Sequence, residues 1–203
     1  LESINRNSER LLKLINDLVD MTKMEKGTFA VNKANSDIIP VIDKCVREMG
    51  PMLEAMKIKT AAEYESPSIQ VQADEYRISQ VFINLINNAV KFSPPGGVIT
   101  VSAASVLAEK AGAPDYAFKD GLKGKNCCKI SVRDSGIGME KQYVQKIFER
   151  FYQIEDINTR KHQGLGIGLN IAKSIVEAHG GIIWADSEGK DKGSVFQVLI
   201  PVE

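Results

Sequence analysis

The sequence predicts a mixed α and β domain preceded by one long helix. Three observations lead to this fold class. Apolar residues recur at helical heptad spacing over residues 1–26, whereas short alternating runs and helical runs follow one another over residues 27–203. The hydrophobic share is 43% and the charged share 26% of 203 residues, the usual mix for a globular protein with a sizeable core.

The predicted first helix carries a seam with alternating spacings of three and four residues. A lone helix with such a seam is marginally stable in water, so we expect it to pack on partner helices. Packing on its own domain as an ordinary surface helix is the alternative. Gly27 is expected to end this helix. The seam comprises Leu1, Ile4, Ser8, Leu11, Ile15, Leu18 and Thr22.

The remainder, residues 27–203, divides into short strands and helices separated by turn residues. Ser36 or Asp37 is expected to cap one helix and Asp74 the next, and Pro94 to Gly97 form a clear break. Residues 105–126, rich in Gly, Ala and Lys, are expected to form a mobile loop without a chemical motif. Strands are predicted at 29–31, 58–64, 69–73, 98–103, 128–133, 182–187 and 194–200, and helices at 36–57, 74–92, 140–149 and 167–179.

Charge and cysteine content exclude several classes of function. Lys plus Arg equals 26 and Asp plus Glu equals 26, so the balance argues against nucleic acid as a partner of the whole surface. No apolar run is long enough to span a bilayer, and no signal peptide is visible. The three cysteines have no zinc-like spacing. We expect a cytoplasmic location with reduced thiols, and a chain that is part of a longer protein.

The predicted helix 74–92 carries the first candidate site. Asn84, Asn88 and Lys91 stand at i, i+4 and i+7, and therefore lie within an arc of about 60° beside the apolar stripe. An amide oxygen is a suitable ligand for Mg²⁺, and an ammonium suits phosphate. A solvated polar face is the alternative interpretation of the same spacing.

The second candidate is the run Asp134-Ser135-Gly136-Ile137-Gly138 at the end of a predicted strand. Asp134 shares strand parity with Ile130 and Val132, so its carboxylate points to their apolar side. Such a carboxylate needs a donor, and the exocyclic amine of adenine is one. The glycines allow the backbone to approach a flat ligand. An ordinary Asp-Gly turn is the alternative.

The third candidate is Gly164-Leu165-Gly166-Ile167-Gly168-Leu169, which opens a predicted helix. Its backbone N–H groups suit an anion, and Arg160, Lys161 and His162 add positive charge just upstream. The spacing fits neither a dinucleotide fingerprint nor a P-loop. Before it, the aromatic residues of Phe148-Glu149-Arg150-Phe151-Tyr152 are expected either to anchor a lid or to pack in the core.

Together and in this order, these motifs resemble the N, G1, F and G2 boxes of the sensor histidine kinases of two-component systems. Residues 1–26 resemble the second helix of the family's dimerisation and phosphoacceptor hairpin, with residues 27–203 as the catalytic domain. The resemblance implies the Bergerat fold, a two-layer α/β sandwich. It also implies transfer of the γ-phosphoryl group of ATP to a histidine, followed by relay to the receiver domain of a response regulator. The implied partners are therefore ATP with Mg²⁺, the hairpin of the parent protein, the response regulator and a second copy of the parent.

The resemblance also assigns roles to residues. Asp134 would bind the adenine amine, Asn88 would hold Mg²⁺, and Lys91 would contact phosphate. Asn84 and Lys91 would be the catalytic pair, and residues 153–163 would form a lid. The remaining ATP-binding positions implied are Gly136, Ile137, Gly138, Tyr152, Lys161, Gly164, Leu165, Gly166, Ile167, Gly168, Leu169 and Ser194.

The sequence departs from the family in its histidines. The two present, His162 and His179, do not stand in a phosphoacceptor box, so we expect the acceptor to precede Leu1 and this chain not to phosphorylate itself. The last box has one glycine, Gly193, where the family often has two. A pseudokinase and an anti-sigma serine kinase remain alternatives. The gyrase, mismatch-repair and chaperone ATPases usually carry Glu at the position of Asn84, which disfavours them.

Overall fold

The computed structural model describes residues 2–154 and 165–202, and the chain divides into two compact units, Leu1–Ala30 and Val31–Glu203. The first unit is helix α1 (Glu2–Glu25) and a turn. Gly27 ends the helix as expected, with φ +64°, and its N–H donates to the Met24 carbonyl at 3.1 Å. The seam residues Leu11, Ile15 and Leu18 are 59%, 50% and 61% exposed. The helix is confirmed, while its partner stays a prediction.

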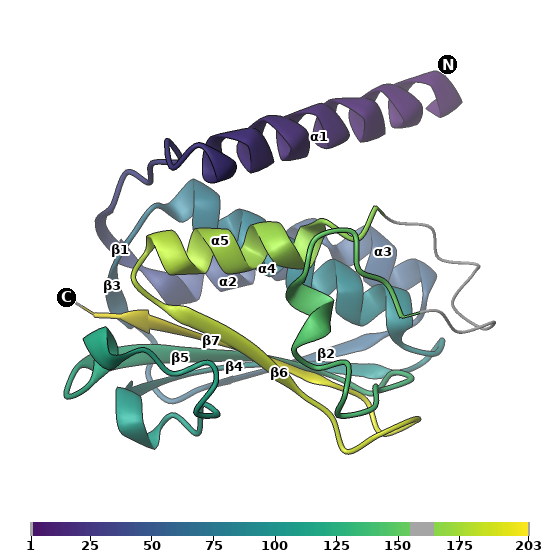
Figure 1. Cartoon of the computed structure of the whole chain (residues 1–203). Helices are drawn as coiled ribbons and strands as arrows, with labels where there is room; N and C mark the ends of the chain where they lie inside the picture. Colours follow the sequence, from purple (N-terminus) through teal and green to yellow (C-terminus); the bar gives the residue numbers. More distant parts are fainter. Residues whose placement is uncertain (1, 155–164, 203) are drawn as a thin grey trace. The chain divides into compact units, whose positions relative to one another are not determined.

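The second unit is a mixed sheet with helices on one face (Figure 1). Strands β2 (Lys59–Tyr64) and β4 (Val98–Leu107) are parallel, and all other neighbours are antiparallel. The order is β2, β4, then β5 (Asn126–Asp134), β7 (Val195–Pro201) and β6 (Ile182–Asp186). A separate pair joins β1 (Ala34–Asp37) to β3 (Gln70–Ala73). The helices are α2 (Ile38–Glu48), α3 (Gly50–Ala55), α4 (Glu75–Phe92) and α5 (Gly168–Ala178).

The core lies between the helices and the inner face of the sheet. Strand alternation puts Ile99, Val101 and Ala103 of β4 on this face, and all three are buried. Helices α2, α4 and α5 contribute buried apolar faces of their own. None of the helices in the described part of the chain is both long and apolar enough to cross a membrane.

Three predicted elements differ from the structure. The strand expected at 29–31 is wrong, since the first strand begins at Ala34. The helix expected at 36–57 is two helices, α2 capped by Asp37 and α3 with Pro51 in its first turn. The helix expected at 140–149 is also wrong. There most backbone bonds reach three residues back, as from the Tyr143 N–H to the Glu140 carbonyl, and only that of Ile147 reaches four. The segment is therefore a series of turns with one 3₁₀ turn at Lys146–Phe148.

The loop expected at 105–126 is instead packed against the sheet. Two 3₁₀ turns, Ala108–Lys110 and Asp120–Leu122, lie on the face away from the helices (Figure 1). Lys129 fixes the segment by donating from Nζ to the Ala111 carbonyl at 2.6 Å. This packing was not predicted, because the apolar residues of the segment have neither helical nor strand spacing. We call the resulting core the outer cluster; it comprises Ala108, Ala111, Leu122, Cys127, Ile182, Trp184 and Leu199.

Candidate functional site

Helix α4 begins at a well-anchored cap. The Asp74 carboxylate accepts from the N–H groups of Arg77 at 3.2 Å and Asn32 at 2.9 Å. The Asp74 N–H donates to Nε2 of His179 at 3.0 Å, while Nδ1 of His179 bonds the Ile175 carbonyl at 2.8 Å. His179 is 2% exposed, and burial lowers its pKa below the ordinary value. A neutral imidazole therefore joins the start of α4 to the end of α5.

The three polar residues of α4 differ in their surroundings. Asn84 is 7% exposed, and its Nδ2 donates to the carbonyl of Gly168 at 3.2 Å. It therefore lies against the first residue of α5, and its amide oxygen accepts no hydrogen bond within residues 2–154 and 165–202. Asn88 and Lys91 are half-buried. Burial lowers the pKa of Lys91, whose Nζ lies 4.7 Å from the centre of the Phe92 ring. A partly desolvated ammonium gains by contacting an anion.

Asp134 ends β5 on the inner face, as the strand parity predicted. It is 6% exposed, and its Oδ1 accepts from the N–H of Gly136 at 2.8 Å and of Ser194 at 3.2 Å. Burial raises the pKa of Asp134, and the two backbone bonds oppose that rise. Both bonds use Oδ1, and in the described part of the chain Oδ2 has no hydrogen bond. This oxygen is the one that can accept from a ligand.

The glycines after Asp134 allow close backbone approach. A Cβ on Gly136 would lie 2.5 Å from the Phe92 carbonyl oxygen, so this residue passes directly beside the end of α4. Gly138 has φ +62°, and a Cβ there would lie 2.1 Å from the Gly189 carbonyl oxygen. Ile137, between them, is 38% exposed. The loop thus runs between the end of α4 and the β6–β7 turn.

Ser194 contributes its backbone to the site. It is 8% exposed, and its N–H donates to Asp134 while its carbonyl accepts from the Asp134 N–H at 2.9 Å. Gly193 has φ +69°, and a Cβ there would lie 2.1 Å from the Asp134 carbonyl oxygen. Gly193 is thus the residue at which the chain passes directly beside the Asp134 backbone.

The start of α5 brings the third motif to the same region. Gly168 is the first residue of α5, and the residue at the cap position, Ile167, has no side-chain hydrogen bond to the helix, so the first N–H groups suit an anion. Gly166 has φ +69° and packs against Phe151 and Tyr152. The described residues of the motif also include Leu165, Ile167 and Leu169, whereas Lys161, Gly164 and most of the expected lid lie outside the described residues.

The two phenylalanines of the aromatic motif differ in their burial. Phe148 is 6% exposed and packs edge-on against Phe196, with ring centres 6.4 Å apart. Its carbonyl accepts from Nδ2 of Asn170 in α5 at 3.0 Å. Phe151 is 65% exposed with φ +59°. Phe148 is therefore a core residue, and Phe151 stands at the point where the chain leaves the core.

Comparison with known proteins accounts for this arrangement. Residues 73–203 match the family described as histidine kinase-, DNA gyrase B- and HSP90-like ATPases. The chain belongs to this ATPase family. The match begins one residue before the Asp74 cap and includes the described site residues. An ATP-binding domain is thus established, and the resemblance to sensor histidine kinases is confirmed by the relatives below.

Three of these relatives carry the comparison further. The sensor histidine kinase WalK of Bacillus subtilis is 35% identical over 195 residues, covering 96% of this chain and 29% of WalK. Full-length ShkA, solved with AMPPNP, is 26% identical with a TM-score of 0.76, covering 98% of this chain and 37% of ShkA. ThkA, solved with the response regulator TrrA, shares the fold at 22% identity and a TM-score of 0.67, covering 100% of this chain and 51% of ThkA. The Bergerat sandwich expected from the sequence is thereby confirmed. The chain spans less than a third of the length of WalK.

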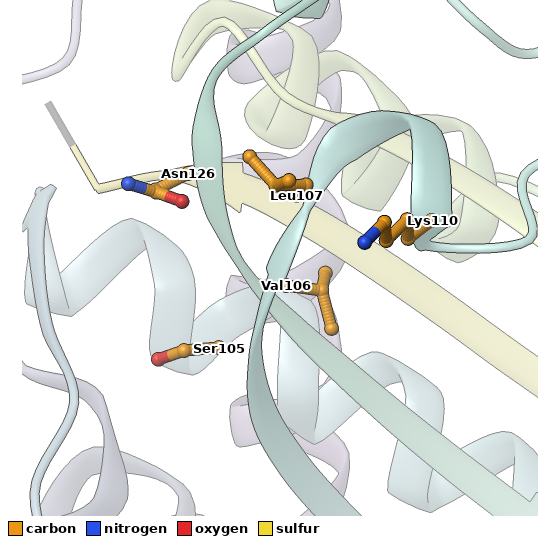
Figure 2. A pocket seen from close by; sticks show the side chains of 5 residues that line it. All are labelled: Ser105, Val106, Leu107, Lys110 and Asn126. Atoms are coloured by element: carbon orange, nitrogen blue, oxygen red, sulfur yellow. The ribbon is translucent and has the colours of Figure 1, made fainter.

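Two cavities of this ATPase domain lie away from the candidate site. One of about 370 Å³ lies at the end of β4 and β5 opposite Asp134 (Figure 2). It is lined by Ser105, Val106, Leu107, Lys110 and Asn126. A second, of about 480 Å³, lies between the inserted segment at 116–119, α5 and β6. Neither is lined by Asp134, Asn88 or Lys91.

Two buried side chains of the ATPase domain make structural bonds near the site that were not predicted from the sequence. No role was predicted for His179, because its sequence neighbourhood does not indicate that it bonds the N–H of Asp74, 105 residues away. Ser187 follows β6 and is 5% exposed, and its hydroxyl connects the loop after Asp134 to the β6–β7 turn. No spacing rule identifies such a serine.

Proposed function

We propose that this chain is the catalytic part of a two-component sensor histidine kinase, transferring the γ-phosphoryl group of ATP to a histidine of the parent's dimerisation hairpin. The observation that carries the proposal is Oδ2 of Asp134: it belongs to a side chain that is 6% exposed, it has no hydrogen bond in the described part of the chain, and it lies beside a glycine loop. Asp134 would accept from the adenine amine, and Gly136, Ile137 and Gly138 would border the base. The identity with WalK and the AMPPNP held by ShkA support the assignment.

The phosphate end would be handled by α4 and the start of α5. Lys91 would form an ion pair with one phosphate oxygen, and the N–H groups at Gly166 to Leu169 would donate hydrogen bonds to another. Tyr152, Lys161 and Gly164 would complete the lid side. Ser194 would act through the N–H that holds Asp134.

Asn88 is the proposed ligand of Mg²⁺. In the described part of the chain no three His, Cys, Asp or Glu side chains gather as a metal site. A lone amide oxygen nevertheless fits Mg²⁺, which is commonly held by few protein ligands together with substrate phosphates. When bound, the ion would neutralise charge on the phosphate oxygens.

In the transfer, an acceptor imidazole nitrogen would form a bond to the γ-phosphorus while the bond to ADP breaks. Asn84 carries no basic group, so it cannot activate water, and its Nδ2 is held by Gly168. Its proposed role is to position the phosphates with Lys91, which stabilises their charge. These two roles assist the transfer, and the lack of a base at Asn84 disfavours hydrolysis.

The acceptor histidine is proposed to lie in the parent's hairpin. His179 is unsuited, since it is buried with both ring nitrogens hydrogen-bonded, and His162 lies outside the described residues. The exposed seam of α1 at Leu11, Ile15 and Leu18 supports a hairpin partner and a homodimer. A response regulator as the next acceptor and a cytoplasmic location belong to the same proposal; the ThkA complex with TrrA supports the former.

Calorimetric titration with AMPPNP, with and without Mg²⁺, tests the nucleotide site. Asp134→Asn keeps an oxygen for the backbone bonds but can place an NH₂ where adenine needs an acceptor. Losing a hydrogen bond to a charged group predicts roughly 10- to 150-fold weaker binding. The matched control is Asp115→Asn, an exposed residue of the inserted segment. Equal affinities for both variants would refute the role of Asp134.

Phosphotransfer is tested by adding a hairpin protein that carries the acceptor histidine, with γ-labelled ATP. Label should appear on the hairpin as acid-labile phosphate and be lost with Lys91→Met. Binding without any transfer would favour the pseudokinase alternative.

A further inference from the structure

Ser187 is the centre of a hydrogen-bond network behind Asp134. Its Oγ accepts from the Met139 N–H at 3.0 Å and from the Gly189 N–H at 3.3 Å. Two carbonyl oxygens can accept the hydroxyl proton of Ser187: that of Gly193 at 2.7 Å and that of Gly189 at 3.3 Å. A hydroxyl has one proton, and the shorter distance assigns it to Gly193.

That carbonyl belongs to the same peptide unit as the N–H that holds Asp134. The Gly193–Ser194 peptide accepts from Ser187 on its oxygen and donates to Oδ1 of Asp134 on its nitrogen. The network therefore runs from the Met139 N–H through the Ser187 hydroxyl and this peptide to the carboxylate. Hydrogen bonds in such chains polarise one another, so each strengthens the next.

Close packing makes the network rigid. A Cβ on Gly138 would lie 2.1 Å from the Gly189 carbonyl oxygen, and one on Gly193 would lie 2.1 Å from the Asp134 carbonyl oxygen. The glycine loop and the β6–β7 turn thus touch backbone to backbone on both sides of Ser187. A shift of the turn would be passed directly to the carboxylate.

We propose that Ser187 is a positioning residue that orients Asp134 for recognition of the adenine amine. It acts through the Gly193–Ser194 peptide and does not touch the ligand. The inference rests on the proposed function, in which Asp134 binds adenine. Its distinctive consequence is that Ser187 affects selectivity for the base, whereas a general structural role would weaken binding of every nucleotide alike.

The test compares ADP with IDP, whose base carries a carbonyl where adenine has the amine. Ser187→Ala should weaken ADP binding roughly 3- to 10-fold, as expected for one neutral hydrogen bond, and leave IDP binding unchanged. The matched control is Ser93→Ala. Ser93 is likewise 5% exposed, but its hydroxyl has no hydrogen-bond partner in the described part of the chain, so the ADP to IDP ratio should stay at the wild-type value.

Asp134→Asn separates failure of the inference from failure of the proposed function. It should abolish the preference for ADP, and adding Ser187→Ala to it should change nothing further, because the serine acts through the carboxylate. A preference that survives Asp134→Asn would overturn the adenine role itself. If only Asp134→Asn removes the preference, the inference about Ser187 alone is overturned.

Equal weakening of both ligands by Ser187→Ala would also overturn the inference. Should that variant not fold, Ser187→Cys provides the second measurement, since a thiol keeps a donor at this position but a weaker one. It should give an ADP to IDP ratio below that of the wild type. An unchanged ratio would contradict the positioning role.

Discussion

Leu122→Ala tests whether the segment at 105–126 is part of the folded core. Leu122 is 1% exposed and packs in the outer cluster with Trp184 and Leu199. Truncating a buried Leu to Ala costs roughly 2–5 kcal/mol in the free energy of unfolding, from lost burial and the cavity left behind. For a chain of this size, a loss of about 3 kcal/mol lowers Tm by roughly 6–12 °C.

Urea unfolding followed by tryptophan fluorescence measures this cost directly. Trp184 is the single tryptophan of the sequence and lies in the same cluster. Leu107→Ala is the control, because Leu107 belongs to the same segment but is 40% exposed. Its expected cost is below about 1 kcal/mol. If the two variants unfold within about 0.5 kcal/mol of each other, the segment does not contribute to the core and the reasoning is refuted.

Three further predictions concern the site. Burial lowers the pKa of His179, so as pH falls the unfolded chain binds a proton at this residue before the folded chain does. The free energy of unfolding should therefore be at its full value above about pH 6.5 and decrease below that pH. In urea titrations, His179→Gln should make this decrease smaller. A wild-type slope in the variant would contradict the assignment. Gly193→Ala should lower the free energy of unfolding by more than about 2 kcal/mol and abolish nucleotide binding. The control is Gly112→Ala: this residue has φ +74° and open space around it, so only backbone strain of about 1 kcal/mol is expected in the same urea assay. Lys91→Met should weaken AMPPNP at least tenfold in calorimetry while leaving adenosine unaffected; equal losses for both ligands would exclude a phosphate contact.

Periodicity predicted the parts of the fold that bury one regular face. Helix α4 repeats apolar residues at helical spacing, and its cap at Asp74 was visible from the sequence. The burial of Asp134 followed from its parity with Ile130 and Val132. These features depend on local spacing, which a sequence displays directly.

What the sequence could not predict depends on contacts between distant segments. The outer cluster brings together Leu122 and Trp184, which stand 62 residues apart in the sequence. The strand that carries Trp184 was predicted, but the segment of Leu122 has neither helical nor strand spacing. Ser187 and His179 act on backbone groups far along the chain, through bonds that any serine or histidine could make. At 140–149 the polar composition resembled a helix, but only Ile147 and Phe148 are buried there, too few to stabilise one.

The bond between His179 and the backbone of Asp74 makes α5 a lever. This helix has 11 residues and is therefore about 16 Å long, with its C-terminal end fastened beside the start of α4. A tilt of about 5° around that fastened end displaces the opposite end by roughly 1.4 Å at this length. Gly168 stands at the far end, so a small tilt of α5 about the imidazole moves the N–H groups where the phosphates are expected to bind.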